Sequence, residues 1–476
     1  MSGLTHLDAI VLVAYLVGIT AWGAWLGRGQ SGGADYFLGG RSLPWGAVLL
    51  SVVATETSTL TFLSIPGVAY VGSLVFLQLT LGYLAGRIAV AVVFLPAYYR
   101  GEISTAYALL EARFGTATRR LASAIFMLTR LMADSVRLFA TAIPLALITG
   151  WPYPVSILVI AGLTLIYTYC GGIRAVVWVD SVQMGLYLLG AAIAVAVIQA
   201  QVPGGWSEVL ASAMLAGKLE VLDFSWSLTA PYTFLAGLLG GAVFTMASHG
   251  TDQLIVQRLL TCRNLRDSQK ALIGSGVVVI GQFLLFLLVG IGLWSFYGGQ
   301  AFDRTDEIFA RFIIDELPAG VTGLLIACVF AAAMSSLSSS VNALASSTAY
   351  DYWAPLVGAS SDEERILKAG KVFTLGWGAL LAAGAIMFIP LSQQTSAVEV
   401  ALGVAAIVYG GLLGAFALGV LARRTGQLGA IAGIGIGIAA VVALQDQVAW
   451  LWYVPIGATI TLLAGLVSDR IFRAIR

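Results

Sequence analysis

Residues 54–67, with the sequence ATETSTLTFLSIPG, lie inside an otherwise apolar stretch that is long enough to cross a membrane. Six of the first eight residues are polar, and Glu56 is ionisable. Pro66 lacks a backbone N–H, and Ser and Thr hydroxyls can bond the backbone in place of a helical amide. The run therefore favours a helix that is interrupted at mid-membrane, where free carbonyls can bind an ion. The alternative is a continuous helix whose hydroxyls bond its own backbone.

The composition of the whole chain points to a lipid environment. Of 476 residues, 59% are hydrophobic and only 10% are charged, whereas soluble proteins carry about 25% charged residues. A membrane helix needs about 20 apolar residues. Thirteen segments qualify: 7–27, 44–71, 73–98, 121–149, 154–170, 175–200, 229–250, 271–297, 318–350, 372–389, 398–421, 428–444 and 448–471. Because the connections are short, we expect a single all-α transmembrane domain over residues 1–476.

Several classes of function are not supported by the sequence. No phosphate-binding G-x-x-x-x-G-K-S/T motif is present, so any pumping must draw on an ion gradient. The three cysteines show no metal-type pairing, and there are only two histidines. The net charge of +1 gives no reason to expect a nucleic-acid partner. No nucleophile or metal set can be assembled, so we expect a transporter and not an enzyme.

The distribution of Lys and Arg gives an orientation, since these residues stay on the cytoplasmic side. With the amino terminus outside, nineteen of the 25 Lys and Arg residues fall in cytoplasmic loops or in the tail. The outer loops hold only Lys218, Arg304 and Arg311. We therefore predict an outside amino terminus, a cytoplasmic carboxyl terminus and an odd number of spans.

The ninth predicted span carries a second unusual run, with five serines in the six positions 335–340. On a helix, Ser335, Ser338, Ser339 and Asn342 share one face. Hydroxyl and carbonyl oxygens around a buried space suit a hard monovalent cation. A small-residue packing face is the alternative, and it explains the neighbouring alanines better than the hydroxyls.

Charged residues inside apolar spans are costly and mark functional positions. Besides Glu56, they are Arg87, Arg130, Asp134, Arg137 and Asp180. We expect Arg87 to have a structural partner, either a carboxylate or free carbonyls. Asp180 could pair with a cation or with Arg174. Asp134 can neutralise one arginine on its own helix face, and the other could meet an anionic group of a solute, or Glu56.

Several short motifs occur together in a specific order and spacing. They are DYFLGGR at 35–41, STAY at 104–107 with LEARFG at 110–115, YTYCGG at 167–172 with WVDSVQ at 178–183, TDQ at 251–253 with VQR at 256–258, and the serine run. With these motifs the chain resembles the sodium/solute symporter family, from about residue 35 into the last third. That family includes sodium/glucose, sodium/proline, sodium/iodide and sodium/sialic acid transporters.

The resemblance implies a LeuT-type fold with two inverted repeats of five helices. The repeats would cover 44–200 and 229–421, with one helix before them (7–27) and two after (428–471). The first helix of each repeat would be broken, which places the breaks in the second and seventh spans. This arrangement agrees with thirteen spans.

The resemblance also implies ion sites. The principal sodium site corresponds to the carbonyls of Ala54, Thr57 and Ala332 and the hydroxyls of Ser335 and Ser336. Some members bind a second sodium, whose ligands correspond to Asp180, Ser338 and Ser339. One or two sodium ions are therefore expected as coupled cargo.

The solute site of the family lies against the broken helices and the third and fourth spans. The candidate solute residues in these segments are Glu56, Ser58, Thr61, Gln78, Thr80, Arg137, Thr245, Ser248 and His249. The polar set that sugar transporters use is mostly missing, and the seventh span has Thr245, Ser248 and His249 instead. Residues 54–67 look most like the sialic acid branch, although Glu56 stands where that branch has a neutral residue. The carboxylate-binding arginine of that branch aligns with Ala133, and Arg130 and Arg137 lie one turn to either side. The solute is left open among organic acids, sugar acids such as sialic acid, sugars and amino acids.

We therefore expect sodium-coupled symport of a small solute into the cell by alternating access. The protein would be a multi-pass protein of the plasma (inner) membrane. The alternative is a proton-coupled symporter that uses Glu56 and Asp180.

Overall fold

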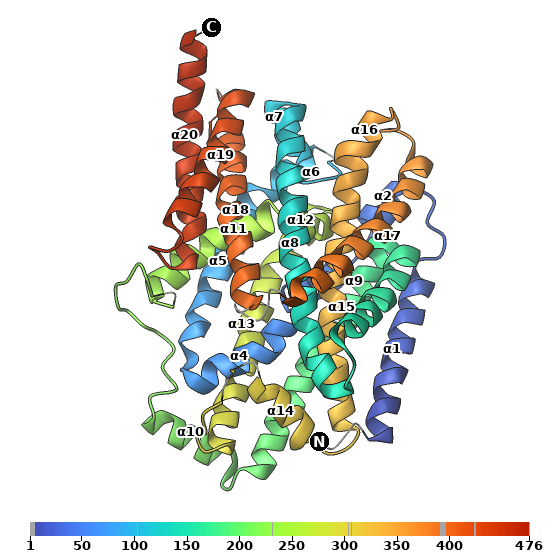
Figure 1. The fold of residues 1–476 in the computed structure, drawn as a ribbon. Coiled ribbons are helices and arrows are strands. Elements are labelled where there is room, and N and C mark those ends of the chain that lie inside the picture. The colour runs from blue at the N-terminus through green and yellow to red at the C-terminus, as the bar shows by residue number, and fades with distance from the viewer. Residues whose placement is uncertain are drawn as a thin grey trace.

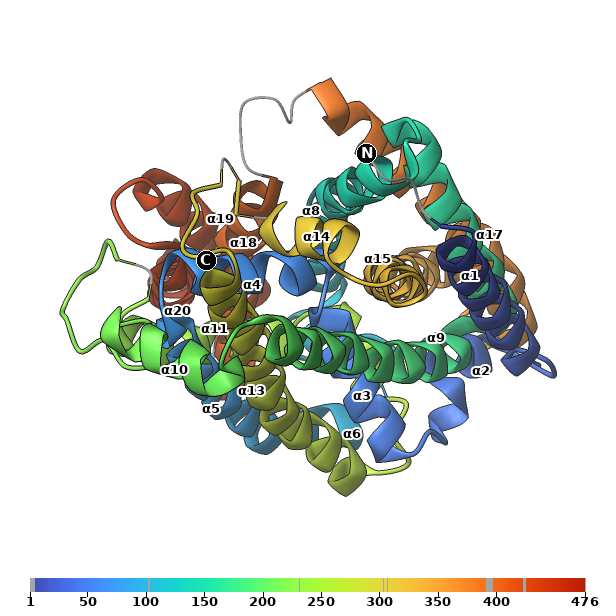
Figure 2. The ribbon, with the colours of Figure 1, turned by 90° about the horizontal axis from the view of Figure 1, so that it is seen from below.

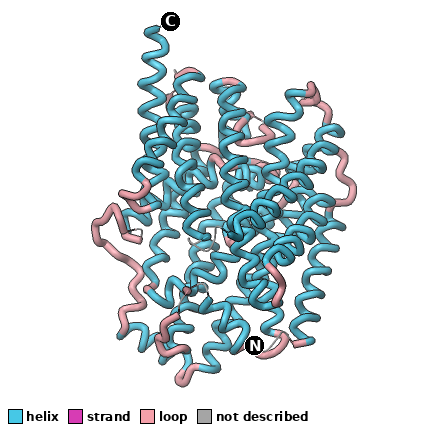
Figure 3. Tube along the Cα trace, viewed as in Figure 1, coloured by secondary structure: helices cyan, strands magenta, loops and turns pink. Residues whose placement is uncertain are grey.

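The computed structural model describes residues 5–475 except 102, 231, 303, 306, 391–396 and 423–424. The described chain is helical, with one isolated bridge between Leu43 and Cys262 as its only strand-like pairing (Figures 1 and 3). The first helices are α1 (His6–Leu26), α2 (Gly33–Leu38), α3 (Trp45–Glu56), α4 (Thr59–Val71), α5 (Leu77–Val93), α6 (Leu95–Arg100), α7 (Ala108–Phe114), α8 (Thr116–Thr149), α9 (Tyr153–Gln201) and α10 (Gly205–Leu215). They are followed by α11 (Gly241–Gly250), α12 (Gln253–Leu259), α13 (Leu265–Phe296), α14 (Glu307–Asp315), α15 (Val321–Ser347), α16 (Ala354–Leu356), α17 (Glu363–Phe388), α18 (Ala397–Leu421), α19 (Gln427–Leu444) and α20 (Tyr453–Ile475).

The predicted interruption of the second span is confirmed. Helix α3 ends at Glu56, and α4 begins at Thr59 at an angle of 61° to it. Ser58 has an extended backbone and caps α4, because its hydroxyl accepts a hydrogen bond from the Thr61 amide. The hydroxyl-rich run thus supplies the partner that a helix start needs.

A second break lies directly after residue 250, where the seventh predicted span was expected to end, and not inside that span. Helix α11 ends at Gly250, and α12 starts at Gln253. Between them, Asp252 has an extended backbone and accepts a hydrogen bond from the Leu254 amide at 2.9 Å. The side chain of Asp252 therefore replaces the intrahelical bonds that are lost at the break.

The fifth and sixth predicted spans are the two halves of α9, which kinks at Gly172. The φ of Gly172 is 52°, and a Cβ there would lie 2.4 Å from the carbonyl oxygen of Tyr36. Only glycine meets both the backbone and the space requirement.

In the described part, eight helices are long and apolar enough to span a membrane, or nine if the bent pair α3–α4 counts as one span. Thirteen spans and an inverted repeat remain predictions. The chain is nevertheless clearly a multi-pass membrane protein, because many large apolar side chains on its outer helices are exposed, as on α1 and α17.

Helix α15 lies at the centre of the bundle. Of the residues in its most apolar stretch, 83% are buried. The helix packs against α1, α8, α9 and α17 (Figure 2). The break between α3 and α4 also contacts α15. Figure 1 places the N-terminus, α4, α10 and α14 on one half of the molecule, opposite the C-terminus. The two polar runs of the sequence therefore meet inside the bundle.

Candidate transport site

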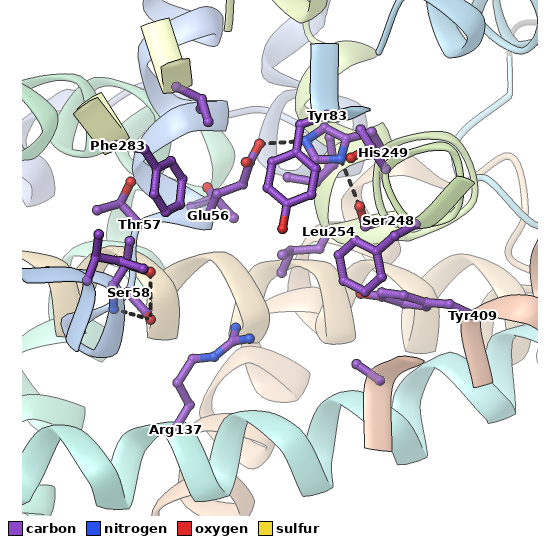
Figure 4. Close-up of a pocket in the computed structure, with 18 of the residues that line it drawn as sticks. Glu56, Thr57, Ser58, Tyr83, Arg137, Ser248, His249, Leu254, Phe283 and Tyr409 are labelled. Atoms are coloured by element: carbon purple, nitrogen blue, oxygen red, sulfur yellow. Dashed lines mark hydrogen bonds and ion pairs between the residues drawn. The ribbon is translucent and has the colours of Figure 1, made fainter. Parts of the chain in front are cut away.

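A cavity of about 270 Å³ starts at the helix break and continues along α4 as far as Val68. Helices α4, α5, α8, α11, α13 and α18 contribute to its wall (Figure 4). Large apolar and aromatic side chains form most of the lining, and they include Phe76, Tyr83, Tyr232, Phe244, Phe283, Tyr409 and Trp450. Such a wall, with a few polar groups at defined places, is typical of a small-molecule site.

The break leaves two backbone carbonyls without their usual helical partners. The amide of Ser58 bonds the Glu56 carbonyl at 3.1 Å, and the amide of Thr61 bonds the Ser58 hydroxyl. In a continuous helix these amides would bond the carbonyls of Ala54 and Thr57. Both carbonyl oxygens are therefore available to another partner.

Two contacts fix where these carbonyls lie along α15. The Thr55 hydroxyl is 3.2 Å from that of Ser339, and the Thr59 hydroxyl bonds the Val329 carbonyl at 3.3 Å. The break is thus held alongside the α15 segment between 329 and 339. Ala332, Ser335 and Ser336 belong to that segment.

The two predicted hydroxyl ligands differ in their surroundings. Ser335 donates a hydrogen bond to Oδ1 of Asp180 at 2.7 Å. Ser336 has a buried hydroxyl oxygen with no hydrogen-bond partner among the described residues. An orphaned buried hydroxyl is costly unless something coordinates it, and a sodium ion would supply that partner.

The partner of Asp180 is Arg258, and not Arg174. Arg258 Nη2 lies 3.4 Å from Asp180 Oδ2, and the same nitrogen donates to the Ser339 hydroxyl. Ser51 accepts from Arg258 Nε at 3.0 Å and donates to Asp180 Oδ2 at 2.7 Å. The set predicted for a second sodium therefore already holds a guanidinium cation.

Arg258 is one of the nineteen basic residues that the charge pattern assigns to cytoplasmic loops. It lies on α12, in the connection between α11 and α13, and is completely buried. A count of loop charges does not distinguish such a buried residue from an exposed one.

Glu56 joins Arg87 and His249 at one end of the cavity. Arg87 Nη2 is ion-paired with Glu56 Oε1, and His249 Nε2 lies 2.5 Å from the same oxygen. Arg87 is fully buried, whereas the Glu56 side chain is 21% exposed and faces the cavity (Figure 4). The expectation of a carboxylate partner for Arg87 is confirmed. His249 Nδ1 in turn lies 2.9 Å from the Ser248 hydroxyl.

The charges on α8 divide between two environments. Arg130 is ion-paired with Asp252 at the second helix break. The Tyr409 hydroxyl accepts a hydrogen bond from Arg130 Nη2 at 2.6 Å and donates one to Asp252 Oδ2 at 2.7 Å. Arg137 lies 3.1 Å from Asp134 and directs its guanidinium into the cavity (Figure 4). Asp134 also lies 3.7 Å from Arg130. Asp134 therefore contacts both arginines. Both also line the cavity, but Arg130 is held by Asp252 and Tyr409, whereas the guanidinium of Arg137 points into the open space.

Most of the predicted solute residues line this cavity. They are Glu56, Ser58, Thr61, Arg137, Thr245, Ser248 and His249, with the predicted sodium ligand Thr57 beside them. Two others do not line it: Gln78 bonds the Tyr232 carbonyl and the Asp223 amide, and Thr80 bonds the Leu77 carbonyl. The aromatic wall was missed, because its members come from distant segments and look like ordinary core residues in the sequence.

Comparison with known proteins identifies relatives along almost the whole chain. The model of the sodium:solute symporter family matches residues 36–437. The sodium/sialic acid symporter SiaT of Proteus mirabilis is 31% identical over 97% of this chain and 94% of that protein. The mouse sodium-coupled monocarboxylate transporter 1 is 28% identical over 90% of this chain and 70% of that protein. A solved Na+-coupled sialic acid symporter, in a substrate-bound outward-open state, superposes with a TM-score of 0.90 at 29% identity, over 98% of both chains.

Proposed function

Because this chain belongs to the sodium:solute symporter family and is a sodium-coupled symporter of a small solute, we propose that its solute is a small organic carboxylate held by Arg137. The single observation that carries this proposal is the guanidinium of Arg137 in the cavity (Figure 4). A guanidinium binds a carboxylate through two parallel hydrogen bonds, and burial strengthens them. Two named relatives, for sialic acid and for monocarboxylates, also transport carboxylates.

The other two arginines near the cavity support Arg137 as the solute partner. Arg87 is fully buried against Glu56, and Arg130 is held by Asp252 and Tyr409. A solute anion would have to break a buried ion pair to reach either of them, which is costly. Arg137 is the more exposed member of its pair, at 20% against 5% for Asp134.

The rest of the cavity indicates what the carboxylate is attached to. The wall is mainly aromatic and apolar, and Glu56 faces the cavity from the wall opposite Arg137 (Figure 4). A carboxylate such as Glu56 only accepts hydrogen bonds when ionised. We therefore infer a solute with a carboxylate at one end, an apolar body, and a hydroxyl or amine donor towards Glu56.

Sodium would bind between the helix break and α15, with the carbonyls of Ala54, Thr57 and Ala332 and the hydroxyls of Ser335 and Ser336 as ligands. Two carbonyls that lack their helical amide partners, and one hydroxyl without a partner among the described residues, support this site. An ion there would tie α3 and α4 to α15 and so hold the cavity wall formed by Ser58 and Thr61. Coupling follows if sodium binds the conformation with this cavity wall more tightly than it binds the inward-facing conformation. Equal binding to both would leave the equilibrium between them unchanged.

We also propose a topology of thirteen spans, from the apolar segments, with two inverted five-helix repeats, from the family resemblance. The charge distribution favours an outside N-terminus, and the location would be the plasma (inner) membrane. The cavity extends along α4 towards the half of the molecule that carries the N-terminus (Figure 1). The solved relative is outward-open. An outward-facing cavity on the N-terminal side is consistent with that state.

The test is a thermal-stability screen of the purified protein in detergent, in sodium and in potassium. The library contains sialic acid, short and aromatic monocarboxylates, hydroxy acids and amino acids. Each acid is compared with the corresponding amide, in which the carboxylate charge is absent. A ligand that binds the folded state raises the apparent melting temperature by mass action. We expect a carboxylate to raise the melting temperature of the protein in sodium but not in potassium. The corresponding amide should not raise it in either salt.

Arg137→Gln should lower the affinity for that solute by about tenfold or more, as loss of a charge-assisted pair does. Sodium-independent stabilisation that follows pH would instead support proton coupling through Glu56 and Asp180. A neutral sugar that stabilises both the wild type and Arg137→Gln would show that the carboxylate assignment is wrong.

A further inference from the structure

A second hollow, of about 440 Å³, lies between α1, α9 and α17 and shares no lining residue with the transport cavity. Helices α1 and α17 both pack against α9, and the hollow occupies the space between them at the end of α1 away from the N-terminus (Figure 1). Its lining includes Trp25 near the end of α1, Arg28 two residues beyond that end, Tyr169 from α9, and Lys371 from α17. None of these residues belongs to the sodium or solute sites described above.

The charge of this hollow is strongly one-sided. Arg28 and Lys371 line it, and no acidic side chain does so among the described residues. Lys371 Nζ lies 5.5 Å from the centre of the Tyr169 ring, a contact that leaves its N–H groups free to donate to an anion. The nearest acids on α17 are engaged elsewhere, because Glu363 accepts from the Ala34 amide and Glu364 pairs with Lys368. Two cations therefore face the hollow without a counter-ion.

The helices around the hollow carry exposed apolar side chains. On α1, Val13 and Val17 are 57% and 61% exposed, and their spacing places them on one face of the helix with Ala21, which lines the hollow. On α17, Val372 and Leu375 follow Lys371 and are 66% and 47% exposed. In a membrane protein, such a surface faces acyl chains. The cations thus lie at the end of an apolar stripe, where a membrane helix meets the headgroup region.

We propose that this hollow binds an anionic phospholipid, with its phosphate between Arg28 and Lys371 and an acyl chain along the Val13–Val17 face of α1. Basic pockets between membrane helices on the cytoplasmic side suit anionic headgroups. The Trp25 and Tyr169 rings would lie at headgroup level, where amphipathic aromatic side chains are favoured. A free phosphate would use the two cations but not the apolar stripe. By bridging α1 and α17, the lipid would add a link between two helices that both pack against α9 and α15.

The experiment uses the full chain in detergent and measures thermal stability and native-mass-spectrometry binding with phosphatidylglycerol, cardiolipin, phosphatidylcholine or inorganic phosphate added. The test variant is Arg28→Gln/Lys371→Gln. The matched control is Arg100→Gln/Lys270→Gln, which removes the same charge from two exposed positions that do not line the hollow. Sodium-dependent stabilisation in each variant confirms that it is folded, and single substitutions replace the double variant if it is not.

We expect the anionic lipids to stabilise the wild type and the control, and the affinity of the test variant to fall by about tenfold or more, since each surface cation contributes to anionic lipid binding. Equal effects of phosphatidylcholine and phosphatidylglycerol would overturn the site. An effect of inorganic phosphate as large as that of the lipids would overturn the lipid assignment. Equal losses in test and control variants would show that only the overall charge matters, and would also overturn it.

Discussion

Nη2 of Arg258 lies 3.4 Å from Oδ2 of Asp180, inside the residue set where a second sodium is expected from the sequence. The two side chains come from α12, just after one helix break, and from the buried middle of α9. Since both are completely buried, the guanidinium supplies the positive charge that Asp180 requires.

The first prediction concerns stoichiometry. Because Arg258 already occupies the Asp180 and Ser339 oxygens, we expect one sodium ion per solute. The sodium dependence of solute binding should have a Hill coefficient near one, and the ratio of sodium to solute flux in proteoliposomes should be near one. A coefficient near two that falls to one in Ser338→Ala would mean that sodium displaces Arg258.

The second prediction isolates the principal sodium site. Ser336→Ala removes a hydroxyl that has no partner among the described residues. In potassium the melting temperature should stay the same or rise, because the substitution removes a buried hydroxyl that costs desolvation energy and has no partner in return. In sodium the ion-dependent increase in melting temperature should be lost.

Ser347→Ala is the matched control for Ser336→Ala. Ser347 lies on the same helix, and its buried hydroxyl is likewise unpartnered in the described structure, but it lies about three turns beyond Ser336. The control should retain the full sodium effect. If both variants lose the effect, or both retain it, the assignment of Ser336 as a ligand is wrong.

The third prediction concerns Glu56 and Arg87. Glu56→Gln leaves the fully buried Arg87 without its carboxylate, which should destabilise the protein by about 3–5 kcal/mol. The double variant Glu56→Gln/Arg87→Leu removes both charges and should recover much of that loss. A thermal or denaturant unfolding series of the two single variants and the double variant measures the coupling. Additive losses would show that the ion pair contributes nothing of its own.

The two helix breaks show what the sequence could predict about the fold. In the run at 54–61, the many hydroxyls compete with the backbone hydrogen bonds of a continuous helix. The helix is interrupted there, at Thr57 and Ser58. The second break, at Thr251 and Asp252, carries little polar signal of its own and was expected only from the family resemblance. The local composition therefore predicted the first break, and the resemblance to the symporter family predicted the second.

The partners of the charged residues were harder to predict. The ion pairs of Arg87 with Glu56, Arg130 with Asp252 and Arg258 with Asp180 join segments 31, 122 and 78 residues apart. Spacing along one helix face indicates neighbours on that helix, as for Arg137 and Asp134, but it says nothing of which other helix packs against it. The aromatic cavity wall depends on the same long-range packing.

The last prediction tests the packing that holds α4 beside the cavity. Gly290 of α13 faces the backbone of Pro66, and a Cβ there would lie 2.0 Å from the Pro66 carbonyl oxygen. Gly290→Ala must therefore push α4 away, at a cost of about 1–3 kcal/mol. Because Ser58 and Thr61 belong to this segment and line the cavity, affinity for the sodium-dependent solute should fall together with stability.

Gly281→Ala provides the control on the same helix. A Cβ at Gly281 meets nothing within 4 Å, and alanine is a better helix former than glycine by about 1 kcal/mol. This variant should be as stable as the wild type or slightly more stable, with unchanged solute affinity. If Gly290→Ala proves equally harmless in unfolding and binding measurements, then α4 can move away from α13 without consequence. The close contact at Pro66 would then have no part in shaping the solute site.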